Sequence, residues 1–74
     1  MTPAEAPAIA ARATHEIHAI THLRVADPRP GYPDACRFWP IVPRASFAVR
    51  RLRSLEAKRD EAYRVIAHAL VGTP

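Results

Sequence analysis

The middle of the chain reads DPRPGYPDACRFWPIVP over residues 27–43. Five of the eight prolines of the 74-residue chain fall here, whereas residues 8–26 and 44–73 contain none. Proline lacks the backbone N–H that an interior helical residue donates, and it favours extended geometry in itself and in the residue before it. The distribution therefore predicts a first helix, a long proline-rich connector and a second helix.

The first helix is predicted over about residues 3–26. Thr2-Pro3-Ala4-Glu5 has the spacing of a capping box, although Pro7 allows a later start. Asp27-Pro28 predicts the end, because the residue before a proline resists the α conformation. The apolar residues recur at helical spacing and share one face: Ile9, Ala13, Ile17 and Ile20.

The second helix is predicted over about residues 44–71, with Gly72 as its stop. Its apolar residues alternate by three and four, which is the spacing of a heptad seam. The seam, interrupted once by arginine, consists of Ala45, Ala48, Leu52, Leu55, Arg59, Ala62, Ile66 and Ala69.

These elements predict an all-α fold with a single domain over residues 1–74. In it, the two helices form an antiparallel hairpin joined by the connector at 27–43. Pro30-Gly31 indicates a turn within that connector. Alanine supplies much of the 49% apolar content, so the core is expected to be thin. Small domains usually need a disulfide, a metal or a partner, and Cys36 is the one cysteine. Self-association as a homodimer, or docking on a larger protein, is therefore expected to complete the fold.

The net charge of +4 lies in the second half of the chain. Residues 1–37 carry four arginines and four acidic residues, whereas residues 38–74 carry seven basic and three acidic ones. Such asymmetry favours an anionic partner, either nucleic acid or an acidic protein surface. The alternative is a solvated helix face balanced by nearby carboxylates. The predicted anion contacts are Arg44, Arg50, Arg51, Arg53, Lys58 and Arg64.

Histidines form a second stripe, on the polar side of the first helix. His15, His18 and His22 are three and four residues apart, a spacing at which two imidazoles can bind one zinc ion. His15 and His22 are separated by about 10.5 Å of helix, so all three cannot easily share an ion. A metal-binding protein is therefore the alternative function, beside a solvated polar face and a pH-sensitive contact.

Apolar side chains offer a third candidate surface. Phe38 and Trp39 in the connector suit either core packing or the anchoring of a partner, and Leu52 and Leu55 of the heptad seam are the further predicted anchors. Catalysis has little support, because neither serine lies in a G-x-S-x-G context and no glycine-rich phosphate loop exists. We expect no enzyme activity and no small-molecule substrate.

The lone cysteine fits a reducing compartment, and no secretory signal or apolar run of about 20 residues is present. The sequence therefore predicts a small basic cytoplasmic protein, not membrane-bound, that binds a macromolecular partner and has an accessory or regulatory role.

Overall fold

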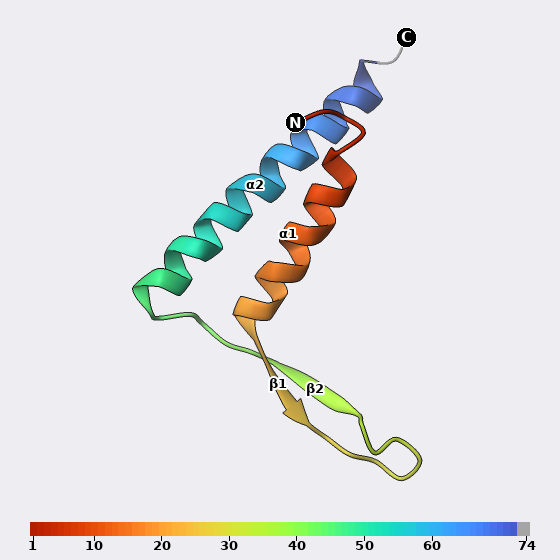
Figure 1. Cartoon of the computed structure of the whole chain (residues 1–74), viewed down its shortest axis with the longest axis vertical. Helices are drawn as coiled ribbons and strands as arrows, with labels where there is room; N and C mark the ends of the chain where they lie inside the picture. The colour runs from red at the N-terminus through yellow and green to blue at the C-terminus, as the bar shows by residue number, and fades with distance from the viewer. Residues whose placement is uncertain (73–74) are drawn as a thin grey trace.

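The computed structural model describes residues 1–72. Helix α1 spans Ala6–Thr21, strand β1 spans His22–Ala26, strand β2 spans Cys36–Pro40 and helix α2 spans Ser46–Val71. The two helices lie side by side and run in opposite directions, and the strands form a ribbon that leads away from one end of them (Figure 1). The N-terminus and the last turn of α2 lie at the opposite end of the helices (Figure 1).

The prediction of an all-α chain, a two-helix hairpin with an irregular connector, is wrong. Residues 22–26, expected to be helical, form β1, and β1 pairs with β2 in a two-stranded antiparallel sheet. Helix α1 ends at Thr21, whose carbonyl accepts a hydrogen bond from the Ile41 N–H at 2.8 Å. The ladder satisfies backbone groups that an irregular connector would leave to water. Of the connector's prolines, only Pro40 lies in a paired strand, at the end of β2, so the ladder loses few donors.

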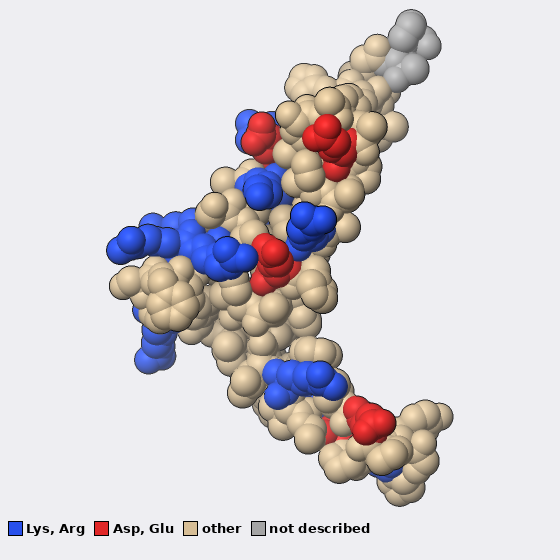
Figure 2. Space-filling view, in the orientation of Figure 1, with Lys and Arg blue, Asp and Glu red and all other residues tan. Residues whose placement is uncertain are grey.

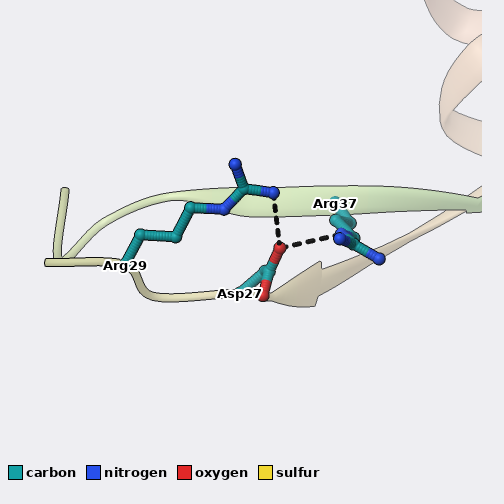
Figure 3. Close-up of polar contacts among 3 residues, drawn as sticks. All are labelled: Asp27, Arg29 and Arg37. Carbon is teal, nitrogen blue, oxygen red and sulfur yellow. Dashed lines mark hydrogen bonds and ion pairs between the residues drawn. The ribbon is translucent and has the colours of Figure 1, made fainter.

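The tip of the ribbon forms around Pro30-Gly31, where the predicted turn is confirmed. Gly31 has a φ of 85°, and Arg29 and Tyr32 exchange backbone hydrogen bonds of 3.2 and 2.8 Å across it. Proline followed by a residue with positive φ is the pattern of a type II turn. Below the turn, the Asp27 carboxylate accepts from Arg37 at 2.7 Å and from Arg29 at 3.3 Å (Figure 3). These contacts hold the two strands together across the tip.

Register assigns each strand residue to a face of the sheet. Leu23 lies opposite Trp39, and Arg24 lies opposite Phe38. Directly paired residues of an antiparallel sheet share a face, and neighbours along a strand alternate between faces. Trp39 and Phe38 therefore lie on opposite faces, and each is about half exposed, at 55% and 51%.

The core lies between the helices and is built mainly from alanine. Small side chains let two helix backbones approach closely, but each buries little apolar area. No side chain larger than alanine is fully buried in the described residues, and the molecule measures 14 Å along its shortest axis. The buried apolar residues are Ala6, Ala10, Ala13, Leu55 and Ala62. Within residues 1–72, neither helix combines the length and apolar content that crossing a membrane requires.

Candidate functional site

A groove of about 530 Å³ runs between α1 and α2 on one face of the molecule. Each helix contributes residues spaced by three and four, which places them on the side that faces the other helix. Three apolar residues line the groove, and the buried Leu55 lies at its floor. We call this the basic groove, and its lining residues are Ile9, Arg12, Ala13, Glu16, Arg50, Arg51, Ser54, Leu55 and Lys58.

Positive charge dominates the basic groove. Four cationic side chains line it, one from α1 and three from α2, against the single carboxylate of Glu16. Arg51 binds Glu16 across the helices at 3.4 Å, with side chains 60% and 37% exposed. An exposed pair of this kind contributes about 0–1 kcal/mol to stability. Figure 2 shows Lys and Arg gathered over the first half of α2 and beside α1, with acidic side chains among them.

The remaining cations of the groove have no acidic partner. Within residues 1–72, Arg12, Arg50 and Lys58 make no ion pair. Guanidinium groups offer paired N–H donors to phosphate or carboxylate oxygens, and the Ser54 hydroxyl adds a further donor. Three unpaired cations around one groove create a positive potential that attracts an anion. The groove is therefore a candidate site for a phosphate-bearing or acidic ligand.

Sequence reasoning found part of this site. Arg50, Arg51 and Lys58 were predicted as anion contacts and line the groove, whereas Arg44, Arg53 and Arg64 do not. Arg12 was missed, because nothing in the sequence of α1 shows that it faces the arginines of α2. Its spacing of four residues from Glu16 was the available signal, since it places both charges on one helix face.

The predicted apolar anchors divide between core and surface. Leu55 is 6% exposed and Leu52 is half-buried, so the heptad seam packs inside this chain. Phe38 and Trp39 remain half exposed on the ribbon, and the Phe38 ring meets the edge of His18 at a centroid distance of 5.0 Å. A partner that binds large apolar side chains would therefore meet the ribbon and not the seam.

The histidines are not arranged around a common point. The rings of His18 and His22 stack at 4.1 Å with 11° between their planes. Ring lone pairs lie in the ring plane, so parallel stacked rings cannot direct theirs at one ion without unstacking. The His22 Nδ1 lies 3.3 Å from the His18 carbonyl oxygen. Since a carbonyl oxygen can only accept a hydrogen bond, Nδ1 is the donor. The described residues contain no group of three or more His, Cys, Asp or Glu side chains able to hold a metal.

Comparison of the chain with protein-family models, with curated proteins and with solved structures finds no match. The function is therefore inferred from the basic groove, the ribbon and the charges on them.

Proposed function

We propose that this chain is a small basic cytoplasmic protein, not an enzyme, that binds nucleic acid through the basic groove and acts as an accessory or regulatory module. The observation that carries the proposal is the convergence of cations from two helices on one groove with a single opposing carboxylate. No zinc function is proposed, because the stacked His18 and His22 rings would have to separate before they could share an ion.

Phosphate is the ligand group that these side chains suit best. Arginine binds phosphate oxygens through paired N–H donors, and lysine adds a point charge. Contacts of this kind position a nucleic acid by its backbone and carry no base sequence information. We therefore expect affinity that is independent of sequence and sensitive to salt.

An acidic protein surface is the alternative ligand, since carboxylates also accept from guanidinium groups. Nucleic acid is favoured because its phosphates repeat at a fixed spacing along a backbone. A groove with Arg12 on one wall and Arg50, Arg51 and Lys58 on the other can contact several of them. Binding of polyglutamate as tightly as nucleic acid at equal ionic strength would contradict this choice.

The experiment compares two double variants that each remove two positive charges. Arg50→Ala/Lys58→Ala removes cations of the groove, and Arg53→Ala/Arg64→Ala removes exposed cations of the same helix outside it. Arg51 is left in place, because its loss would also leave the Glu16 carboxylate unpaired in the groove. Fluorescence anisotropy with labelled duplex and single-stranded oligonucleotides, and with polyglutamate, gives the dissociation constants.

We expect the groove variant to weaken nucleic-acid binding by at least about tenfold and the control by less than about threefold, since Arg53 and Arg64 do not line the groove and would not touch a phosphate bound in it. Equal losses would show that binding depends on the cations of α2 in general and not on the groove. Failure of the unaltered protein to bind any oligonucleotide at low salt would overturn the proposal.

A further inference from the structure

The molecule exposes more surface than a folded monomer of its size. Its radius of gyration is 16.5 Å, whereas a compact domain of this length has about 11 Å. Its accessible surface is 6068 Å², whereas a folded monomer of 8.2 kDa exposes about 4,500 Å². The difference of about 1,500 Å² is twice what each partner buries in a standard interface, about 800 Å². A stable dimer would therefore need to bury only about half of this excess surface on each copy.

Several exposed apolar side chains lie together on one face of the ribbon. Leu23 is 55% exposed, Trp39 55% and Val25 36%, and register places all three on the same face, together with Arg37, which lies opposite Val25 and binds Asp27. Ile41, 43% exposed, continues this face because its N–H donates to Thr21 and extends the ladder by one pair. We call these four apolar residues the apolar face. The other face is partly covered, since Phe38 on it contacts His18.

The ribbon is also a segment on which two copies repel each other only weakly. Its charges are three arginines and two aspartates, and Asp27 already binds Arg29 and Arg37 (Figure 3). The helices, by contrast, carry the unpaired cations of the basic groove, which would repel the same groove of a second copy. Charge therefore opposes self-association through the groove and permits it through the ribbon.

A two-stranded sheet is only marginally stable in water unless a further layer covers it. The ribbon leads away from the helices, so they leave the apolar face uncovered (Figure 1). An interface related by a two-fold axis brings the same patch of each copy together, and an apolar patch is complementary to itself. A second ribbon thus supplies the layer that the first one needs.

We propose that the chain forms a homodimer in which the apolar faces of two ribbons pack against each other, leaving both basic grooves free. Trp39 is the one tryptophan of the chain and lies in this interface, so its fluorescence reports on the contact. Dimer formation shifts its emission to shorter wavelength and shields it from a soluble quencher such as iodide. This inference is independent of nucleic-acid binding and is tested without any ligand.

The experiment measures mass by sedimentation and Trp39 emission from about 0.1 to 100 μM, a range that brackets ordinary dimer affinities. Leu23→Lys places a charge in the apolar face, and Leu70→Lys, at a residue 75% exposed near the end of α2, is the matched control. We expect a dimer with shielded Trp39 in the unaltered protein and the control. Leu23→Lys raises the dissociation constant at least about tenfold.

A charge-exchange pair separates loss of the interface from loss of the fold. Leu23→Lys and Leu23→Glu are each expected to be monomeric, and mixing them restores the dimer because opposite charges then meet across the interface. A monomer with exposed Trp39 throughout the concentration range would overturn the proposal. So would a dimer that survives Leu23→Lys, or a mixture of the two variants that stays monomeric.

Discussion

At the scale of single residues, Glu16 sets the balance of the basic groove. Its carboxylate is the one negative charge among four cations, and it holds Arg51 at 3.4 Å. An anion that enters the groove competes with Glu16 for that guanidinium. The residue therefore supports the helix pair while it opposes the binding of a polyanion.

Glu16→Gln is expected to tighten nucleic-acid binding by about twofold to fivefold, since removing one exposed ion-pair partner changes the free energy by about 0.3–1 kcal/mol. Anisotropy with a labelled oligonucleotide measures the change. Glu61→Gln removes the same charge from an exposed position of α2 outside the groove and serves as the control. Unchanged or weaker binding by Glu16→Gln would show that the ligand does not enter the groove.

Gly31 is the residue on which the ribbon turn depends. A side chain there would meet nothing within 4 Å, so the backbone conformation alone, with φ at +85°, opposes substitution. Gly31→Ala is expected to cost about 1–2 kcal/mol, and Gly31→Asn less, because asparagine tolerates this region better. Hydrogen exchange of the Tyr32 amide, which donates to Arg29 across the turn, should be slowest with glycine, faster with asparagine and fastest with alanine. Equal exchange in all three proteins would contradict this account of the turn.

At the scale of elements, the helices could be predicted from the sequence and the ribbon could not. Residues 8–21 and 46–71 carry long helical periodicity without an interior proline. Leu23 and Val25 alternate with polar residues, which is the signal of a strand, but over five residues it is too short to oppose the helical pattern before it. The prolines near both strands also made the pairing of β1 with β2 harder to predict, since proline favours an irregular loop as well.

The basic groove was only partly predictable for a related reason. Periodicity shows which residues of α2 share a face, but it does not show which face of α1 packs beside them. Arg51 and Glu16 are 35 residues apart in sequence and meet only in the fold. The charges on α2 could therefore be identified in the sequence, whereas the wall formed by Arg12 could not.

The alanine contact between α1 and α2 limits the size of side chains in the core. Ala62 is fully buried and clusters with Ala6 and Ala10. Ala62→Leu is expected to force the helices apart and destabilise the fold by about 1–3 kcal/mol, which lowers the melting temperature by at least about 5 °C. Ala67→Leu adds the same side chain at an exposed position of α2 and should have little effect. Circular dichroism at one fixed concentration tests both, and equal melting temperatures would refute close packing at Ala62.

At the scale of the whole molecule, the helices and the ribbon carry two different surfaces. The helices bring cations of both halves of the chain to one groove, and the ribbon extends an apolar face away from that groove. The excess surface of the chain follows from this division, because neither part covers the other. We therefore propose one partner for each surface: a polyanion in the groove and a second copy on the ribbon.

The salt dependence of nucleic-acid binding tests the central claim most directly. With three unpaired cations in contact with phosphates, the logarithm of the association constant should fall with the logarithm of salt concentration at a slope of about −3. Arg50→Ala/Lys58→Ala should reduce this slope to about −1, whereas Arg53→Ala/Arg64→Ala should leave it near −3. The same slope in the groove variant and the unaltered protein would contradict the account.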